Sequence, residues 1–365
     1  MKKMKVGVIG CGMISNAYLT AAAKFDILEV VGCADLDMDL ANAKAEEHGI
    51  KAMTVEKLLA SKQIDAVINL TPPKAHFPVT VQILEAGKHA YSEKPFGISD
   101  EETAKIMELA NRKKLLVGCA PDTFLGGGQQ TARKLIDDGW IGEPLGGTAI
   151  VMGRGPEKWA SAPFFYDIGG GPMLDLGPYY ITALVNLLGP AKSVTGVTLR
   201  GAKTRKCGPA SVPPFKEYPV NVNTHQTGVV EFKSGAVITV IASFEVYRHQ
   251  HNPIEIYGSQ GSLVVPDPNT FGGPVKIFKP GYTEWVESPL SHGYTENSRS
   301  IGLADMAYAI QKKRPHRANG DLANHVLEIM MAFDKSSAAG RKIILKTTCE
   351  RPAALPVGLE AGLLD

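Results

Sequence analysis

Near the amino terminus the sequence reads Lys5-Val6-Gly7-Val8-Ile9-Gly10-Cys11-Gly12-Met13-Ile14-Ser15, an apolar strand that runs into a glycine turn and then a helix. In the dinucleotide fingerprint the first glycine, Gly10, allows a tight turn, and the second, Gly12, lets the backbone approach a pyrophosphate. The helix that starts near Met13 offers free N–H groups and its positive dipole end to phosphates. We therefore predict a dinucleotide site at Gly10, Gly12, Met13 and Ile14. An ordinary tight turn between strand and helix is the alternative.

An acidic residue follows the second predicted strand at the distance that this fingerprint requires. The strand covers residues 28–33, and Asp35 comes about 20 residues after the glycines. A carboxylate there accepts hydrogen bonds from both ribose hydroxyls and repels the extra phosphate of NADP, and no arginine stands at Leu36 to bind that phosphate. Because such residues also cap helices, we assign Asp35 to the ribose and Asp37 to the cap. NAD is the predicted cofactor, and NADP is the alternative.

Short apolar runs alternate with helical patterns over the first 122 residues. The apolar runs cover residues 6–9, 28–33, 66–70, 89–92 and 115–119, and the helical patterns cover residues 14–24, 38–48, 79–86 and 101–112. Fully apolar strands that alternate with helices indicate a parallel sheet covered on both faces, and right-handed crossovers make it doubly wound. The predicted fold class is α/β, with a Rossmann domain over residues 1–122.

A different pattern begins at residue 123 and continues to residue 365. A helix is predicted over residues 129–138, and strands over 146–154, 193–200, 227–232, 236–244, 254–257, 262–265 and 275–278. Period-2 alternation and turns between these strands indicate the hairpins of an antiparallel sheet. Helices are predicted over residues 298–313 and 321–338, a loop over 208–219 and a terminal arm over 351–365. We therefore expect residues 123–365 to form an α+β domain with a large, mainly antiparallel sheet.

The composition argues against several classes of protein. The net charge of +2 and the absence of a Lys/Arg-rich block argue against a nucleic-acid partner. No apolar stretch reaches the roughly 20 residues of a membrane span, and the first apolar run ends at Gly10, too early for a signal peptide. The five cysteines are scattered without a CxxC pair, so neither disulfides nor a zinc site is expected. His249 and His251 have no metal-ligand partners at suitable spacing, and a cytoplasmic protein without a metal is predicted.

Two further segments follow strands at their carboxyl ends, where ligands collect in open parallel sheets. The first reads Asn69-Leu70-Thr71-Pro72-Pro73-Lys74-Ala75-His76. Its prolines hold the loop rigid, so we expect Thr71 and Pro72 at the cofactor. His76 is a third candidate for the cofactor site; the alternative is a residue at a helix start that packs on its own turn.

The second segment is Glu93-Lys94-Pro95, which leaves the strand over residues 88–92 at the same edge. Pro95 fixes its own backbone and restricts Lys94 to an extended conformation, so the ammonium is held in one direction. We expect Glu93 and Lys94 at the cofactor site, with Lys94 in reach of a substrate. The alternative is a solvated lysine that pairs with Glu93.

Together these motifs resemble those of the Gfo/Idh/MocA oxidoreductase family, named after glucose–fructose oxidoreductase and inositol dehydrogenase. A further motif of that family stands in the second domain as Gly169-Gly170-Gly171-Pro172-Met173-Leu174-Asp175-Leu176-Gly177-Pro178-Tyr179, and the resemblance covers nearly the whole chain. It implies hydride transfer between NAD(P) and a sugar, polyol or cyclitol. It also implies a substrate-binding second domain whose open sheet mediates homodimers or homotetramers. Lys94 matches the family's substrate-orienting lysine and Asp175 its active-site aspartate.

One position departs from the family pattern, which usually has a histidine four residues after the aspartate as the general acid/base. This chain has Tyr179 there, as glucose–fructose oxidoreductase and dihydrodiol dehydrogenases do. A spacing of four would place Asp175 and Tyr179 on one helical face, but Pro178 either kinks that helix or marks its regular start. An unperturbed tyrosine has a pKa of about 10. We expect the Lys94 ammonium and the positive nicotinamide to lower the pKa of Tyr179.

These assignments lead to a mechanistic hypothesis. Lys94 hydrogen-bonds the reacting hydroxyl, Tyr179 takes its proton, and the hydride passes to the nicotinamide. Asp175 orients the sugar through a neighbouring hydroxyl or serves as the base itself. A core-packing role for Tyr179 is the alternative.

Weaker candidates for contacts with the substrate stand elsewhere in the chain. His225 opens a strand and either faces the cleft or is a satisfied edge-strand histidine, and Asp122 near the domain junction is either a hinge or a ligand contact. Arg154 and Trp159 bracket a Gly/Pro-rich segment that could close over the substrate.

Three functions remain open from the sequence. The first is an NAD-dependent sugar or polyol dehydrogenase, and the second is an enzyme that cleaves glycosides through a transient keto-sugar with NAD retained. The third is a non-catalytic NAD(H)-sensing subunit, which the intact Glu93-Lys94-Pro95 motif disfavours.

Overall fold

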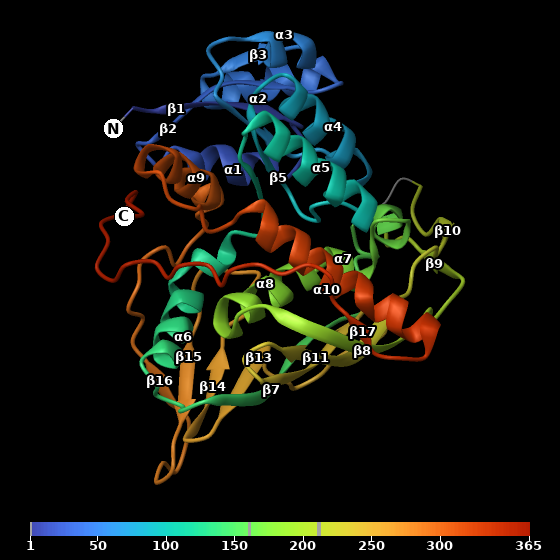
Figure 1. Ribbon diagram of the computed structural model, residues 1–365. Helices are drawn as coiled ribbons and strands as arrows, with labels where there is room; N and C mark the ends of the chain where they lie inside the picture. Colours follow the sequence, from blue (N-terminus) through green and yellow to red (C-terminus); the bar gives the residue numbers. More distant parts are fainter. Residues whose placement is uncertain (1, 160–161, 210–212) are drawn as a thin grey trace.

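The computed structural model describes residues 2–159, 162–209 and 213–365 and shows two stacked domains (Figure 1). In the amino-terminal domain the strands are β1 (Met4–Ile9), β2 (Leu28–Ala34), β3 (Lys51–Met53), β4 (Ala66–Asn69), β5 (His89–Ser92) and β6 (Val117–Cys119). They are parallel and lie in the order β3-β2-β1-β4-β5-β6. The helices are α1 (Ser15–Ala22), α2 (Met38–His48), α3 (Val55–Ala60), α4 (Pro73–Glu85) and α5 (Asp100–Lys113). This strand order is that of the predicted Rossmann fold.

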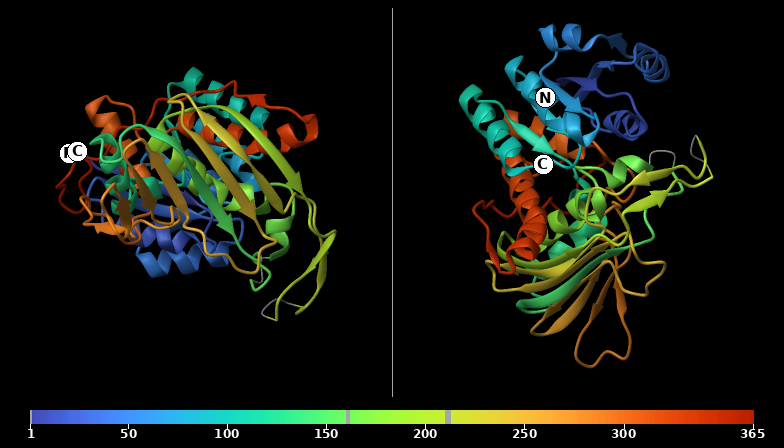
Figure 2. Two further views of the ribbon diagram at one scale, coloured as in Figure 1. Left: turned by 90° about the horizontal axis from the view of Figure 1, so that it is seen from below. Right: turned by 90° about the vertical axis from the view of Figure 1, so that its right-hand side faces the viewer.

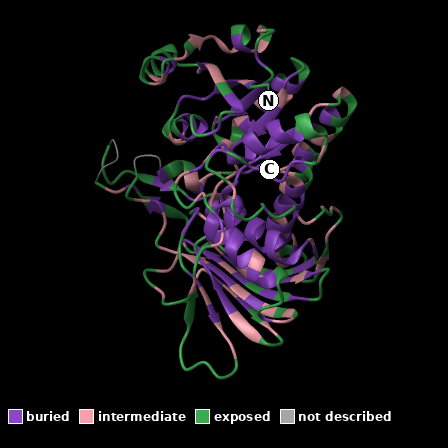
Figure 3. Cartoon of the chain, turned by 90° about the vertical axis from the view of Figure 1, so that its left-hand side faces the viewer, coloured by how far each residue is buried: buried purple, intermediate pink, exposed green. Residues whose placement is uncertain are grey.

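Both faces of the parallel sheet are buried, and neighbouring residues of β4 therefore belong to different hydrophobic cores. Ile68 packs in one core with Val8 of β1. Val67 packs in the other with Leu84 of α4 and Ile106 of α5. Because successive side chains of a strand point to opposite faces, such a strand needs an unbroken apolar run. Figure 3 shows the resulting layers of buried residues in both sheets and in the helices between them.

The second domain is built on a nine-stranded sheet in the order β16-β15-β14-β13-β7-β12-β11-β8-β17. Its strands are β7 (Pro144–Met152), β8 (Ala191–Leu199), β11 (His225–Phe232), β12 (Val237–Ser243), β13 (Ile254–Gly258), β14 (Gly261–Val265), β15 (Val275–Phe278), β16 (Val286–Ser288) and β17 (Ile343–Ile344). All neighbouring strands pair antiparallel except β7 and β12, which are parallel. A small hairpin of β9 (Thr204–Lys206) and β10 (Glu217–Pro219) stands apart from it. The predicted mainly antiparallel sheet is thus confirmed.

Helices cover one face of the large sheet and leave the other face open. The helical elements are η1 (Thr123–Leu125), α6 (Gly127–Asp137), η2 (Ala162–Tyr166), α7 (Gly171–Asp175), α8 (Gly177–Leu188), α9 (Ile301–Lys312) and α10 (Gly320–Ala339). On β8, Gly196 lies directly against Phe333 of α10, whereas its neighbour Val197 is exposed. Seen from below, the strands face the viewer with the helices behind them (Figure 2, left).

The carboxyl-terminal part of the chain returns to the Rossmann domain. In the segment before α9, the side chains of Asn297 and Ser300 donate hydrogen bonds to the carbonyl oxygens of Ala17 (3.0 Å) and Tyr18 (3.2 Å) in α1. At the end of the chain, the Asp365 side chain accepts hydrogen bonds from Arg314 after α9. The junction between the domains is therefore built partly from residues that lie almost 300 positions apart.

Several elements differ from the sequence-based expectation. β3 and α3 were not predicted, because three and six residues are too short for a clear periodic pattern. Helix α4 begins at Pro73 rather than at residue 79, since proline is tolerated in the first turn of a helix. Residues 217–219 of the expected loop form β10. Within the described ranges, no helix has the length and apolar character needed to cross a membrane.

Candidate active site at the domain junction

The glycine turn requires glycine at its first position for two reasons. Gly10 has a φ of 101°, in the region that side chains disfavour. A Cβ atom there would lie 2.6 Å from the carbonyl carbon of Leu70 and 2.9 Å from the amide nitrogen of Thr71. The close approach brings the turn against the loop after β4, so both loops border the same edge of the sheet.

The second glycine borders open space that suits a pyrophosphate. A Cβ atom on Gly12 would meet no atom within 4 Å. Helix α1 has no side-chain cap at Ile14, and the N–H groups of Gly12, Met13 and Ile14 donate no hydrogen bond to another residue in the described part of the chain. Space, free donors and the positive end of α1 therefore fit the phosphates of a dinucleotide at this turn.

Asp35 lies directly beside the glycine turn, as a ribose-binding carboxylate should. Its Oδ2 accepts a hydrogen bond from the Cys11 amide at 2.7 Å, and its Oδ1 accepts one from the Asp37 amide at 3.0 Å. Asp37 in turn caps α2 by accepting from the Asp39 amide at 2.9 Å, so its assignment to the cap is confirmed. Leu36, which follows Asp35, is 97% exposed.

His76 connects the loop after β4 with the loop after β5. The ring is buried. Its Nδ1 lies 2.7 Å from the Pro95 carbonyl oxygen and its Nε2 lies 2.6 Å from the Thr71 carbonyl oxygen. Both ring nitrogens are thus engaged by the protein, and burial lowers the pKa of His76. The ring contacts its own loop at Thr71 and a second loop at Pro95, and its contact with the cofactor stays a prediction, as do those of Thr71 and exposed Pro72 at the edge of the sheet.

The Glu93 carboxylate is held by two groups of the protein. Its Oε1 accepts a hydrogen bond from the Tyr18 hydroxyl at 2.7 Å and its Oε2 accepts one from the Lys94 amide at 2.8 Å. The side chain is buried, and its contact with the cofactor stays a prediction. Because Tyr18 belongs to α1, these two hydrogen bonds connect the Lys94 loop with the helix whose amino terminus faces the predicted phosphate site.

The structure brings together the three residues predicted to carry the chemistry. The Lys94 Nζ lies 2.9 Å from Asp175 Oδ1 and 2.5 Å from the Asp175 carbonyl oxygen, and it lies 5.3 Å from the centroid of the Tyr179 ring. Both charged side chains are mostly buried, with exposed fractions of 16% and 13%. Burial disfavours the ammonium, but the charges of Asp175, Tyr179 and Glu93 prevail and raise the pKa of Lys94. Lys94 is therefore a fixed cation that contacts both residues from the second domain.

A break in the helix decides how Asp175 and Tyr179 face Lys94. Asp175 ends α7, and Gly177 begins α8 with Pro178 in its first turn. Of the two arrangements open from the sequence, the one in which the regular helix starts near Pro178 is confirmed. The two side chains consequently come from successive helices rather than from one helical face.

The Lys94 ammonium lowers the pKa of Tyr179, as expected, but the net shift is upward. Burial of the phenol raises its pKa, and this effect outweighs the opposing charges of Lys94 and Arg299. Arg299 contacts the Tyr179 hydroxyl as a hydrogen-bond donor. Sequence reasoning missed this residue, because an arginine before a helix 120 positions away from Tyr179 carries no motif.

The other predicted substrate residues make their own contacts within the second domain. His225 lies on the open face of the large sheet, because the next residue, Gln226, donates to Asp334 of α10 on the covered face and successive side chains alternate. It hydrogen-bonds Ser243 at 2.9 Å, and it stands on an interior strand rather than on an edge strand. Arg154 pairs with Glu245 at 3.4 Å, and Trp159 packs on Phe165.

Asp122 is a buried residue of the domain junction. Its Oδ2 accepts a hydrogen bond from the Gly302 amide in the first turn of α9 at 3.0 Å, and its contact with the substrate stays a prediction. Burial raises the pKa of Asp122 to about 6, against the hydrogen bond from Gly302 and the charge of Arg299.

This raised pKa predicts a pH dependence of stability. Between about pH 4 and pH 6 the unfolded chain releases the Asp122 proton while the folded chain keeps it, so stability falls as pH rises. Two pKa units correspond to about 3 kcal/mol. Urea unfolding of Asp122→Asn, which still accepts from Gly302, should show less of this fall than the wild type. Identical pH dependence in both proteins would contradict the prediction.

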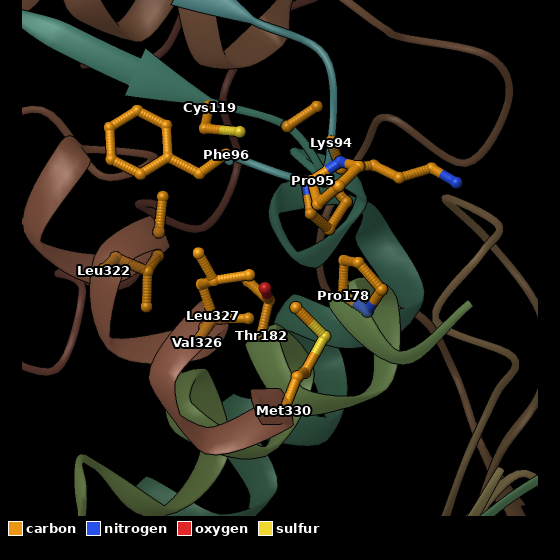
Figure 4. A pocket seen from close by; sticks show the side chains of 13 residues that line it. Lys94, Pro95, Phe96, Cys119, Pro178, Thr182, Leu322, Val326, Leu327 and Met330 are labelled. Carbon is orange, nitrogen blue, oxygen red and sulfur yellow. The ribbon is translucent and has the colours of Figure 1, made fainter. Parts of the chain in front are cut away.

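The small cavity under the Lys94 loop is distinct from the catalytic cluster. It is lined by apolar side chains, including Phe96, Leu322 and Met330. The volume that the centre of a water molecule can occupy is about 10 Å³, which is room for about one molecule. Lys94 contributes to its wall, but its ammonium points away from it (Figure 4). In the described part of the chain, no group of three or more His, Cys, Asp or Glu side chains is placed to hold a metal ion.

Comparison with known proteins agrees with this architecture. Residues 4–120 match the family model "Oxidoreductase family, NAD-binding Rossmann fold" and residues 129–264 match "GFO/IDH/MocA C-terminal domain". The dTDP-3,4-didehydro-2,6-dideoxy-alpha-D-glucose 3-reductase of Saccharopolyspora spinosa is 28% identical over 295 residues, which are 79% of this chain and 83% of that protein. The D-glucoside 3-dehydrogenase of Escherichia coli (strain K12) is 28% identical over 252 residues, 66% of this chain and 70% of that protein.

A solved structure shows the same fold over nearly the full length. Levoglucosan dehydrogenase in complex with NADH and levoglucosan superposes with a TM-score of 0.81 at 20% sequence identity, covering 95% of this chain and 100% of that chain. The first domain is thus an NAD-binding Rossmann domain, and the second is the carboxyl-terminal domain of the same family. The chain belongs to the GFO/IDH/MocA family of NAD-binding oxidoreductases.

Proposed function

We propose that this protein transfers a hydride between a nicotinamide and a secondary hydroxyl carbon of a sugar. The observation that carries the proposal is the contact of Lys94 with both Asp175 and Tyr179, beside the edge of the sheet where the glycine turn lies. A cation next to a tyrosine and a carboxylate can polarise, deprotonate and orient an alcohol at one point. A nicotinamide bound to the Rossmann domain supplies the ring carbon that accepts or gives the hydride.

The three side chains have separate tasks in the oxidation of an alcohol. Lys94 donates a hydrogen bond to the substrate oxygen and stabilises the negative charge that develops there. The Tyr179 phenolate takes the hydroxyl proton while the C–H bond gives up its hydride. Asp175 holds the Lys94 ammonium in place through the 2.9 Å ion pair and accepts a hydrogen bond from a neighbouring hydroxyl of the sugar. In the reverse direction, neutral Tyr179 returns the proton to the carbonyl oxygen.

The names of two relatives support a more specific substrate. One is a 3-reductase of a dTDP-linked hexose and the other is a D-glucoside 3-dehydrogenase, so both names specify position 3 of the sugar. We extend this position to the present chain and propose a hexopyranoside, oxidised or reduced at C3, as the substrate class.

The experiment that tests the function mixes the purified protein with NAD⁺ and matched sugars. Glucosides, their 3-deoxy analogues, inositols and open-chain polyols are compared by the absorbance of NADH formed. NADH formation with glucosides but not with 3-deoxy analogues supports the proposal. Release of the aglycone without net NADH identifies the glycoside-cleaving reaction instead, and binding of NADH without any turnover identifies a sensing subunit.

Asp35 is proposed to give preference for NAD over NADP. Asp35→Asn keeps an oxygen that can accept from the Cys11 amide but removes the charge that repels the 2′-phosphate. We expect the ratio of kcat/KM for NAD to that for NADP to fall about tenfold or more, because charges a few ångströms apart near a surface interact by several kcal/mol. Asp37→Asn is the control, since it keeps the α2 cap and should not change the ratio. An unchanged ratio in Asp35→Asn would refute the assignment.

The open face of the large sheet is proposed to bind a second copy of the chain. Apolar residues on strands of this sheet are exposed, among them Val197 at 65% and Leu199 at 50%. Exposed apolar patches of this kind mark interaction surfaces. The mass in solution should therefore exceed that of one chain, and Val197→Glu should reduce it; a wild-type protein of monomeric mass would exclude this interface.

A further inference from the structure

Arg299 differs from the other arginines that are buried or half-buried in the described structure. Arg133, Arg205, Arg314, Arg317 and Arg351 each pair with a carboxylate at 2.9 Å or less. Arg299 is half-buried, and among the described residues no carboxylate lies within ion-pair distance of it. It directs its guanidinium to the Tyr179 hydroxyl instead. Even a half-buried cation without a paired anion is costly unless something compensates its charge.

The backbone around Arg299 is anchored on the Rossmann domain. The Arg299 amide donates to Asn297 Oδ1 at 3.3 Å. The following residue, Ser300, donates through its hydroxyl to the Tyr18 carbonyl oxygen at 3.2 Å, and Gly302 donates to Asp122. The side chain thus comes from the carboxyl-terminal segment, but the backbone that carries it is held by α1 and by the loop after β6.

The charges that face Tyr179 come from two further parts of the chain. Lys94 and Glu93 lie on the loop after β5, and Arg299 lies before α9. Behind Arg299 stand Asp122 and the Tyr18 hydroxyl, the latter hydrogen-bonded to Glu93 at 2.7 Å.

A count of charges shows what Arg299 contributes. The Lys94 ammonium is neutralised by Asp175 at 2.9 Å, so that pair has no net charge. Lys94 still lowers the pKa of Tyr179 and Glu93 raises it, whereas Arg299 lowers it both by its charge and by its side-chain hydrogen bond. Arg299 is therefore the cation beside the phenol that is not already paired with a carboxylate at short distance. Burial disfavours the guanidinium, but the charges of Tyr179 and Tyr18 prevail and raise the pKa of Arg299, so it stays protonated over the whole range of an assay.

We propose that Arg299 is the positioning residue that orients Tyr179 and stabilises its phenolate as the counter-ion. The inference rests on the proposed role of Tyr179 as the acid/base. Without Arg299, the buried phenol would hold its proton more strongly, and fewer molecules would have a competent base at neutral pH.

The test compares pH profiles of single-turnover sugar oxidation in Arg299→Gln, Arg299→Lys and the wild type. In Arg299→Gln the rate at neutral pH should fall about tenfold or more, and its rising limb should move to higher pH by about one unit. At alkaline pH the rate should approach that of the wild type. The pH profile of Arg299→Lys should lie between those of the wild type and Arg299→Gln, because lysine keeps the charge but not the planar guanidinium with its several donors. The control is Arg112→Gln, an exposed arginine on α5 paired with Glu85.

The same substitution in a Tyr179→Phe protein distinguishes a failure of this inference from a failure of the proposed function. In Tyr179→Phe, the further change Arg299→Gln should alter the rate little, because the group it acts through is gone. The phenolate absorbance of Tyr179, taken as the difference between the wild type and Tyr179→Phe, should appear at higher pH in the Arg299→Gln protein, which is independent of turnover. An unshifted titration, or a rise in KM with an unchanged pH profile, would overturn the inference while leaving Tyr179 as the base. If Tyr179→Phe alone keeps the full rate, the proposed role of Tyr179 fails, and this inference fails with it.

Discussion

Lys94→Met is expected to lower the rate of hydride transfer by a factor of about 10²–10³, the usual cost of removing one donor at an oxygen that gains negative charge. The methionine is of similar length and fills the space but donates no hydrogen bond. The loss should appear in the single-turnover rate constant of hydride transfer, with the affinity for NADH nearly unchanged. A wild-type rate in Lys94→Met would remove the observation on which the proposed function depends.

Two controls separate the chemistry of Lys94 from its structural role. The Lys94→Met change leaves the mostly buried Asp175 without its cation, which costs about 3 kcal/mol of stability for a buried pair. The double variant Lys94→Met/Asp175→Asn should recover part of that stability in a urea titration but none of the rate. Lys134→Met removes another lysine–aspartate pair, with Asp138 at 2.6 Å on the surface of α6, and should leave the rate unchanged.

Tyr179→Phe is expected to lower the rate of sugar oxidation by a factor of about 10²–10⁴, the range for one positioned acid/base group. The rising limb of the pH profile should vanish as well, because it reports ionisation of this phenol. Burial raises the pKa of Tyr179, so in the wild type the rate should rise with pH through the neutral range and beyond. Asp175→Asn should also be slow, but it should keep the rising limb.

The matched control for this tyrosine is the residue beside it. Tyr180 is also buried in α8, and its hydroxyl makes a hydrogen bond to Asp267 at 3.4 Å. Tyr180→Phe removes the same atom from the same helix and should leave the rate and the pH profile unchanged. If Tyr179→Phe keeps both while Asp175→Asn loses both, then Asp175 is the base and the assignments must be exchanged.

The first domain could be predicted closely because its determinants are local. The parallel strands are apolar runs, and α2 begins at its cap Asp37 and ends before Gly49 in the left-handed conformation. The glycine turn is also local, since Gly10 has a positive φ. β3 and α3 were missed because they are short, and their place at the edge of the sheet depends on pairing with β2.

The residues of the candidate site were also predicted in part from local motifs, but their contacts were not. Lys94, Asp175 and Tyr179 stand in motifs, and the structure brings them into contact. Glu93 and His76 also stand in motifs, but their contacts are internal. Whether a polar side chain in a motif touches a ligand or supports a loop depends on which neighbours bury it, and a sequence does not state that.

The sequence by itself determined the Rossmann fold, the family, the cofactor class and three residues of the candidate site. It could do so because spacing along the chain decides local backbone geometry, and the glycine turn, the strand ends and the motif before α8 are local. Only the tertiary structure decided that α7 and α8 are separate helices, that burial raises the pKa of Tyr179, and that Arg299 stands beside it. These facts depend on desolvation and on charges from segments more than 80 residues apart, which act through space and leave no pattern in the sequence.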